Sequence, residues 1–329
     1  MDYSFDFIIF TVMDENQNTL LRDELLKRNM SSFDIIVSHN GTGIALLEAI
    51  DYIMIHQLNY KKVLLINSGG NATRNPQFHD IGKIFIPTPE YDNDDKVILD
   101  DILKQADILI QNVKNPGIFI CTSDSICNIH ASLPVIEHSC AITIRTDTSS
   151  CSSYGVFVPD KNIIKEFLHK KELSFLQERG AVFQNSILVD TGIFYLDYVT
   201  LFYIYYHYNH YLTNHEFLDY YAVVVPDICN FFEIELVECK DSEFIHLGDN
   251  PNYYQFLMSR GVHSVHSTFD KNFLIPNHSF FYHSIVGDGV SVGDYSMIFN
   301  SELSNIVIPE HSLVYTDHGE LVIQRFESK

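Results

Sequence analysis

The sequence of 329 residues predicts an α/β protein: a doubly wound, Rossmann-like sheet over residues 1–257, then a short left-handed parallel β-helix over residues 258–329. In the first part, apolar runs of strand length alternate with helix-like stretches and with turns that contain glycine, which is the βαβ pattern of a parallel sheet. In the second part, Val286, Val292 and Ile298 recur every six residues. This spacing is typical of hexapeptide coils, and we expect the three side chains to point inward from adjacent coils.

The elements of the first part follow from the apolar periodicity, since continuous apolar runs predict buried strands and apolar residues three and four apart predict helices. The predicted strands are residues 5–12, 34–37, 63–66, 117–122, 141–145 and 187–196. The predicted helices are residues 17–28, 44–55, 95–112 and the tyrosine-rich stretch 198–212. We expect residues 160–167 to begin as a turn and continue as a short helix, and residues 231–239 and 243–247 to form a hairpin.

Composition excludes some classes of partner. The formal net charge is −22, which argues against a nucleic-acid surface and against an anionic membrane. The six cysteines show no zinc-like spacing, the first residues lack the pattern of a signal peptide, and no uncharged apolar stretch reaches membrane-spanning length. The expectation is a cytoplasmic protein with free thiols, which must hold any anionic substrate by local cations and a metal ion.

A loop after the apolar run 63–66 carries the strongest chemical signal. Gly69 and Gly70 let the backbone turn sharply and present N–H groups, while Arg74 and Lys83 add two cations. Backbone N–H groups, a guanidinium and an ammonium are the groups that commonly bind a triphosphate. The alternative is an ordinary glycine-rich turn with two solvated cations, which is what Gly-Gly alone usually means. The ordered string of glycines, arginine, proline, glycine and lysine is far more specific.

This loop, residues 68–83, resembles the signature loop of sugar-1-phosphate nucleotidyltransferases, and within them the fucose-1-phosphate guanylyltransferase (GDP-fucose pyrophosphorylase) branch. The residues that carry the resemblance are Ser68, Gly69, Gly70, Arg74, Pro76, Gly82 and Lys83. The resemblance implies that Ser68, Gly69 and Gly70 bind the nucleotide. It also implies that Arg74 and Lys83 are catalytic, because in the family they steady the pyrophosphate leaving group.

Two aspartates are candidate ligands of Mg²⁺. Asp124 follows the predicted strand 117–122, and doubly wound sheets bind ligands beyond the carboxyl ends of their strands. The resemblance likewise implies a metal aspartate after this strand, although Asp124 also suits the start of a helix. Residues 216–220 resemble the stretch in which the family carries its second acidic residue. This implies Asp219 as the second metal ligand, with Asp227 as the fallback.

The sugar-phosphate side of the site rests on the resemblance too. His169-Lys170-Lys171 is similar to the His-Lys-Pro of the family, with lysine in place of proline, and implies that Lys170 contacts the sugar phosphate. A solvated basic turn is the alternative. The predicted strand 187–196 resembles the strand that lines the sugar pocket, which makes Thr191 and Gly192 candidates and Asp190 a weaker one. Whether the turn at residues 40–43 caps a helix or contacts the nucleotide stays open.

The resemblance implies that the chain joins a nucleoside triphosphate, with GTP favoured, to a sugar 1-phosphate, with fucose 1-phosphate favoured. Pyrophosphate leaves, and Mg²⁺ is the expected cofactor. One alternative is a catalytically inactive, nucleotide-sugar-binding or regulatory homologue of the same fold. Another is an acyltransferase that uses His278, His283 or His311 as a base between coils. The sequence leaves open the base, the sugar, the pathway and whether the chain forms a homo-oligomer.

Overall fold

The computed structural model of the chain describes residues 4–55, 61–68, 73–90, 95–129, 133–149 and 151–326. The chain divides into two compact units. Unit 1 comprises Met1–Gly70 and Asp101–Phe244, and unit 2 comprises Asn71–Asp100 and Ile245–Lys329. This division differs from the predicted domains, 1–257 and 258–329, because it groups both the segment 71–100 and residues 245–257 with the later part of the chain. The domain boundary in the sequence stays a prediction.

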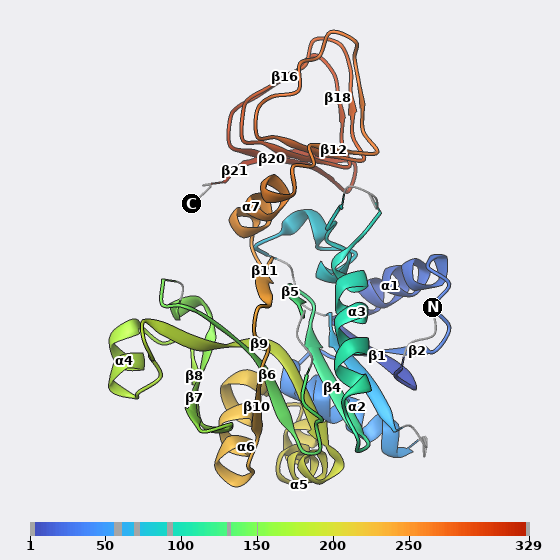
Figure 1. Cartoon of the computed structure of the whole chain (residues 1–329). Helices are drawn as coiled ribbons and strands as arrows, with labels where there is room; N and C mark the ends of the chain where they lie inside the picture. Colours follow the sequence, from blue (N-terminus) through green and yellow to red (C-terminus); the bar gives the residue numbers. More distant parts are fainter. Residues whose placement is uncertain are drawn as a thin grey trace. The chain divides into compact units, whose positions relative to one another are not determined.

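Unit 1 is built on a nine-stranded sheet with the order β2-β1-β3-β4-β9-β6-β10-β8-β7 (Figure 1). The strands on one side are β1 (Phe7–Val12), β2 (Phe33–Val37), β3 (Lys62–Asn67) and β4 (Gly117–Thr122), and all of them are parallel. The other strands are β6 (Cys140–Asp147), β7 (Gly155–Asp160), β8 (Ile163–His169), β9 (Ser186–Asp197) and β10 (Glu235–Glu238). β9 runs antiparallel to both neighbours, β4 and β6, so the sheet is mixed where an all-parallel one was expected.

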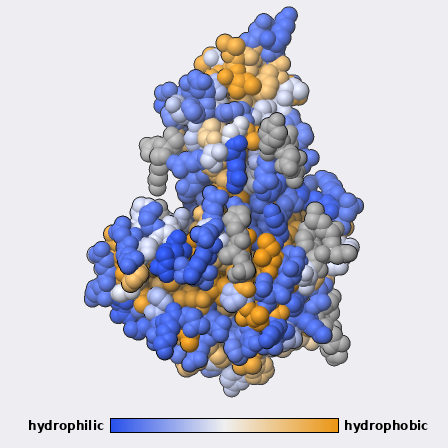
Figure 2. Space-filling view, in the orientation of Figure 1, coloured by the Kyte–Doolittle hydropathy of each residue, from blue (hydrophilic) through white to orange (hydrophobic). Residues whose placement is uncertain are grey.

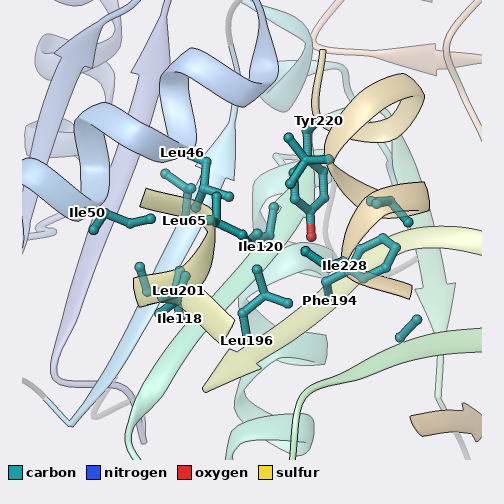
Figure 3. Packing of buried hydrophobic residues seen from close by; sticks show 14 of the residues in the cluster. Leu46, Ile50, Leu65, Ile118, Ile120, Phe194, Leu196, Leu201, Tyr220 and Ile228 are labelled. Carbon is teal, nitrogen blue, oxygen red and sulfur yellow. The ribbon is translucent and has the colours of Figure 1, made fainter. Parts of the chain in front are cut away.

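Both faces of this sheet are buried. Ile9, Leu65 and Ile120 belong to a core in which α2, α5 and α6 cover one face (Figure 3). The residues that alternate with them, such as Phe10 and Leu64, are fully buried as well, so the opposite face is covered too. The helices of this unit are α1 (Glu15–Lys27), α2 (Thr42–Ile55), α3 (Ile98–Gln111), α4 (Leu173–Glu178), α5 (Tyr198–Asn214), the π-helical turn η4 (Tyr220–Val224) and α6 (Val225–Phe231); the residues of α3 before Asp101 fall in unit 2.

Two of the predicted elements are wrong. Residues 160–167 were expected to form a short helix, but β8 is a strand that pairs antiparallel with β7. Lys161 adopts φ 58°, so the chain turns back directly and β7 supplies the hydrogen-bonding partner. The predicted hairpin of 231–239 and 243–247 does not form either. β10 pairs with β6 and β8, whereas β11 (Glu243–His246) pairs with β5 (Ser125–Asn128) in a separate sheet.

Unit 2 contains α7 (Asn250–Arg260) and short strands stacked in three sheets, which Figure 1 shows as a triangular coil; the strands are parallel except for β21. One sheet holds β12 (Ser264–Val265), β14 (Phe280–Tyr282), β17 (Met297–Phe299), β20 (Ser312–Asp317) and β21 (Glu320–Arg325). The second sheet holds β13 (Thr268–Phe269), β15 (Ile285–Val286) and β18 (Glu302–Leu303), and the third holds β16 (Ser291–Val292) and β19 (Val307–Ile308). The handedness of the coil stays a prediction.

The six-residue repeat marks successive sides of this coil. Val286, Val292 and Ile298 lie on β15, β16 and β17, which belong to three different sheets. They were expected to stack on one another in adjacent coils. The residues that stack between coils are instead pairs such as Ile298 on Phe281 and Val292 on Ile308. The prediction that these side chains point into the coil is confirmed, because all of them belong to one buried core.

Polar side chains dominate the surface in view in Figure 2, with hydrophobic residues gathered in patches. All six cysteines are free and buried. Among the helices that the structure describes, none combines the length and the apolar content that crossing a membrane requires. Cytoplasmic localisation stays a prediction.

We predict that Val292→Asp destabilises unit 2 by roughly 3–5 kcal/mol, the cost of a charge buried without a partner. Val292 is 9% exposed and packs inside the coil. The neighbouring Ser291 lies on the same strand but is exposed, so Ser291→Asp is the matched control and should change stability by less than about 0.5 kcal/mol. Urea unfolding of both variants measures the difference. Equal stability of the two variants would contradict the assignment of Val292 to the core.

Candidate functional site

Ser68 follows β3 at the carboxyl edge of the sheet. Its backbone N–H and its hydroxyl both donate to the carbonyl oxygen of Thr11 on β1, at 3.1 and 2.7 Å. The Thr11 hydroxyl in turn donates to Oδ1 of Asn67 at 3.2 Å. The Ser68 side chain thus fixes the ends of two strands at the start of the signature loop. Gly69 and Gly70, the other predicted nucleotide-binding residues, lie outside the described residues.

The turn at residues 40–43 holds the segment that carries Asp219. The N–H of Leu218 donates to the carbonyl of Asn40, and the N–H of Gly43 donates to the carbonyl of Leu218, both at 2.9 Å. A Cβ atom added at Gly41 or Gly43 would lie 2.5 Å from atoms of Leu218. Both glycines are therefore needed for this close approach. Nucleotide contact from the turn stays untested.

Asp124 lies directly after β4 and before β5, partly exposed. Because a strand follows it, Asp124 caps no helix, and the alternative interpretation of this residue does not hold. Its carboxylate is one of the charges that raise the pKa of Tyr221, after burial, Asp190, Tyr220 and Cys121. The charge of Asp124, at the carboxyl end of β4, therefore acts on the Tyr221 phenol.

β9 bulges near Thr191 and Gly192, where its register with β6 shifts. Thr191 is 1% exposed and its hydroxyl donates to the carbonyl of Ile142 at 2.7 Å, so its side chain is committed to holding β9 against β6. Gly192 has φ 75°, and a Cβ there would lie 2.7 Å from the Thr122 side chain. The bulge brings the Gly192 backbone against the end of β4, two residues before Asp124.

Asp190 and Tyr221 complete this part of the site, and sequence reasoning missed Tyr221. The N–H of Gly192 donates to Oδ1 of Asp190 at 2.8 Å, and the Tyr221 hydroxyl donates to the carbonyl of Gly192 at 3.4 Å. Burial raises the pKa of Asp190 to about 7, against the opposing effect of the Gly192 hydrogen bond. The phenol gave no signal in the sequence, because tyrosines are frequent throughout this chain.

Lys170 follows β8 directly and is exposed. Its backbone adopts φ 48°, and its N–H donates to the carbonyl of Tyr154 at 3.0 Å. The preceding His169 is half-buried. Burial, and then the positive charge of Lys170, lower the pKa of His169, whereas the charge of Asp219 raises it. Lys170 and Asp219 thus both act on His169, which places the predicted sugar-phosphate ligand and the predicted metal ligand in one electrostatic neighbourhood.

The two candidates for the second metal ligand differ in their hydrogen bonds. Asp219 caps η4, and its Oδ1 accepts from the N–H of Ala222 at 2.7 Å. Among the described residues this is the only hydrogen bond of its carboxylate, so the other carboxylate oxygen can face an ion. Asp227 accepts from the hydroxyls of Tyr208 and Tyr203 at 2.7 and 3.3 Å, which tie α5 to α6. Asp227 is therefore structural, and Asp219 is the better choice.

Arg74 and Lys83 lie in unit 2, whereas the residues above lie in unit 1. Arg74 is exposed and, within the described ranges, forms no ion pair. The segment around them is anchored to α7: Gln77 Nε2 donates to Oδ1 of Asn250 at 2.7 Å, and the Tyr253 hydroxyl donates to the carbonyl of Pro87 at 2.9 Å. Both predicted catalytic cations therefore belong to a folded segment of this unit.

The donor chemistry of the predicted metal residues fits Mg²⁺. Asp124 and Asp219 offer carboxylate oxygens, which this hard cation prefers. In the described residues, the groups of three or more ligands that lie within reach of one ion are elsewhere and include neither aspartate. Water and phosphate oxygens would have to supply the remaining ligands, which is usual for Mg²⁺.

We predict that Asp190 makes stability fall as the pH rises. Its pKa is about 7 in the folded chain and about 3.9 in an unfolded one, so between these values the folded state holds a proton that the unfolded state has lost. Asp190→Asn removes this titration and keeps an oxygen for the Gly192 N–H. The variant should therefore gain stability over the parent at about pH 8 relative to about pH 5.

Urea unfolding at both pH values measures this gain. Asp147→Asn is the control, because the Asp147 carboxylate is exposed and hydrogen bonds from Ser149 lower its pKa. A pH-independent difference between Asp190→Asn and the parent would show that Asp190 is an ordinary solvated carboxylate.

The solved structures that match this chain have low sequence identity to it and low TM-scores. A nucleoside-diphosphate-sugar pyrophosphorylase from Vibrio cholerae is 10% identical with a TM-score of 0.41, covering 77% of this chain and 80% of that one. A mannose-1-phosphate geranyltransferase from Thermus thermophilus is also 10% identical with a TM-score of 0.41, covering 97% and 94%. Likeness at this level carries no argument about this chain.

Sequence comparison is more informative. A bifunctional fucokinase/GDP-fucose pyrophosphorylase from Arabidopsis thaliana is 26% identical over 155 residues. This match covers 41% of the chain but spans only 15% of that protein. The family model described as the Fucose pyrophosphorylase domain matches residues 55–222, just over half of the chain. The match begins before the signature loop and extends through Asp124, Lys170, Gly192 and Asp219. The chain therefore belongs to the fucose pyrophosphorylase family.

Proposed function

We propose that the chain transfers a nucleotidyl group from a nucleoside triphosphate to a sugar 1-phosphate and releases pyrophosphate. GTP and fucose 1-phosphate are the favoured substrates, because the family and the Arabidopsis relative both carry fucose pyrophosphorylase in their names. The observation that carries the proposal is Asp124, a partly exposed carboxylate at the carboxyl end of β4 that caps no helix. Sheets of this kind bind their ligands beyond the carboxyl ends of their parallel strands, which is where this carboxylate lies.

In the proposed reaction, a phosphate oxygen of the sugar 1-phosphate attacks the α-phosphorus in line. The bond between the α-phosphorus and the oxygen that bridges to the β-phosphate breaks, and pyrophosphate leaves with that oxygen. The protein supplies position and charge. Ser68, Gly69 and Gly70 hold the nucleotide, while Arg74 and Lys83 neutralise the β- and γ-phosphates as charge accumulates on the leaving group.

Lys170 holds the phosphate of the sugar substrate, and the backbone at Gly192 borders the sugar. The Thr191 hydroxyl is already bound to a carbonyl, so we assign Thr191 a part in shaping the bulge that presents Gly192. Asp124 and Asp219 would hold Mg²⁺, which supplies charge neutralisation at the phosphate oxygens when bound.

An inactive homologue would be favoured by a missing metal carboxylate. Both carboxylates are present, and Asp219 keeps one oxygen without a hydrogen bond among the described residues. We therefore favour the active enzyme. Release of pyrophosphate, measured with each of the four nucleotides against a panel of sugar 1-phosphates, tests the reaction and its specificity together. No release with any pair would refute the proposed activity.

Arg74→Ala and Lys83→Ala should each lower kcat by about a hundredfold or more, because each removes a cation that stabilises charge in the transition state. The KM for the sugar phosphate should change little. Lys104→Ala is the matched control, since Lys104 is an exposed lysine of α3 with no assigned role. Steady-state kinetics on folded proteins measures the effect, and near-normal kcat in both variants would remove the loop from the mechanism.

Activity should need a divalent cation, with Mg²⁺ sufficient, and a chelator should abolish it. Asp124→Asn and Asp219→Asn should be almost inactive while remaining folded, as measured by circular dichroism. Asp227→Asn is the control and should keep most of its activity, because Asp227 is bound to two tyrosines. If Asp219→Asn keeps its activity and Asp227→Asn loses it, Asp227 and not Asp219 is the second metal ligand.

A further inference from the structure

Two histidines of unit 2 lie next to each other at one corner of the coil, with their ring planes tilted by 45°. Val265 on β12 pairs with Tyr282 on β14, and the next residues in the chain, His266 and His283, occupy equivalent positions. Both have φ 46°, the left-handed conformation that turns each coil at this corner. Their ring centroids lie 4.8 Å apart. The pairing of the coils thus fixes two imidazoles side by side on the surface.

A carboxylate completes the group. Asp95 lies in the other segment of unit 2, just before α3, and its Oδ1 is 2.7 Å from Nε2 of His266. One ligand atom from each of Asp95, His266 and His283 lies within 4.8 Å of the other two. Ligand atoms of a tetrahedral zinc ion lie roughly 3.4 Å apart, given metal–ligand distances of about 2.1 Å. Small side-chain rotations close the difference.

From this arrangement we propose that Asp95, His266 and His283 bind a divalent transition-metal ion, with Zn²⁺ as the best match. Two imidazole nitrogens and one carboxylate oxygen suit Zn²⁺, Co²⁺ or Ni²⁺, whereas Mg²⁺ takes oxygen ligands almost alone. All three residues are exposed, so the ion can enter and water can fill the fourth position. This ion is separate from the Mg²⁺ proposed for the reaction.

The ion would be structural. The ion would link Asp95, which lies in the segment that also carries Arg74 and Lys83, to two successive coils of the same unit.

A second group in the described residues combines Asp80, Asp317 and His318. It offers one imidazole only. His318 is 83% exposed at its side chain and adjoins Asp317 in the chain, with 3.8 Å between Nε2 and the carboxylate oxygen. No pairing of strands fixes His318 against a second histidine within the described part of the chain. This group is therefore the weaker candidate and serves as the competing outcome of the test.

The test uses the full chain after treatment with a chelator and dialysis. Zn²⁺ titration by calorimetry should show one saturable equivalent, and Zn²⁺ should raise the melting temperature where Mg²⁺ does not. Bound Co²⁺ should give the visible absorption of nitrogen-ligated cobalt. His266→Ala and His283→Ala should each weaken Zn²⁺ binding by at least about tenfold, since loss of a residue that only orients a ligand already costs about 10–100-fold.

His278→Ala is the matched control. His278 also sits at a coil corner with positive φ, but its ring stacks on Tyr295 at 5.3 Å and belongs to neither ligand group. Its Zn²⁺ affinity should equal that of the parent. His283→Gln keeps size and polarity, so it separates loss of a ligand from loss of folding, and metal-free melting curves check the fold of every variant.

The proposal falls if the parent binds no Zn²⁺ saturably, or if His266→Ala and His283→Ala bind it normally. It also falls if His318→Ala abolishes binding while those two variants do not, because the ion then belongs to the competing group. Since every readout is metal binding or melting, an inactive enzyme leaves the proposal intact, and failure of the proposal leaves the proposed reaction intact.

Discussion

The contact between Gly192 and the Thr122 side chain determines how unit 1 presents its functional residues. β9 runs antiparallel between two strands that point the same way, and its register shifts where it passes the carboxyl end of β4. At that point the backbone of Gly192 takes a left-handed conformation so close to Thr122 that any side chain would collide. The bulge sets the Gly192 carbonyl against the Tyr221 hydroxyl, so the strand that interrupts the parallel sheet also shapes the site.

Most elements of the first part could be predicted because their apolar pattern is visible in the sequence without knowledge of their partners. Helices such as α2 and α5 follow from apolar spacing, and buried strands such as β3 and β4 follow from continuous apolar runs. β8 could not be predicted in this way. Its apolar residues, at 163, 164, 167 and 168, fit the period of a helix, and pairing with β7 and β10 makes it a strand. The supposed hairpin after residue 231 failed for another reason, since β10 pairs with β6 and β8, and β11 with β5, far away in the chain.

For the candidate site, the sequence predicts which residues take part but not their surroundings, and the roles of these residues stay a prediction. Asp124 could be placed because the end of a central strand is visible in the apolar pattern. The Thr191 hydroxyl, by contrast, is bound to the carbonyl of Ile142, and no pattern of residues shows a hydrogen bond to a backbone 49 positions away. From the sequence, Asp219 was preferred as the second metal ligand and Asp227 was the fallback, and the hydrogen bonds from two tyrosines of α5 add a structural difference between them. The tyrosine-rich stretch 198–212 forms the predicted helix, and its hydroxyls add hydrogen bonds that the apolar pattern does not reveal.

The antiparallel strand β21 has a consequence for self-association. Stacked parallel strands leave open backbone groups on the last strand of each sheet, and such an edge is a template for another chain. β21 pairs with β20 along its whole length, from Ser312 with Arg325 to Asp317 with Glu320. Its side chains include Glu320, Gln324 and Arg325, which are exposed. The five-stranded face therefore ends in a strand of reversed direction that carries Glu320 and Arg325 beside the exposed Leu321 and Ile323, so another parallel coil would not find there the parallel edge on which the earlier coils stack.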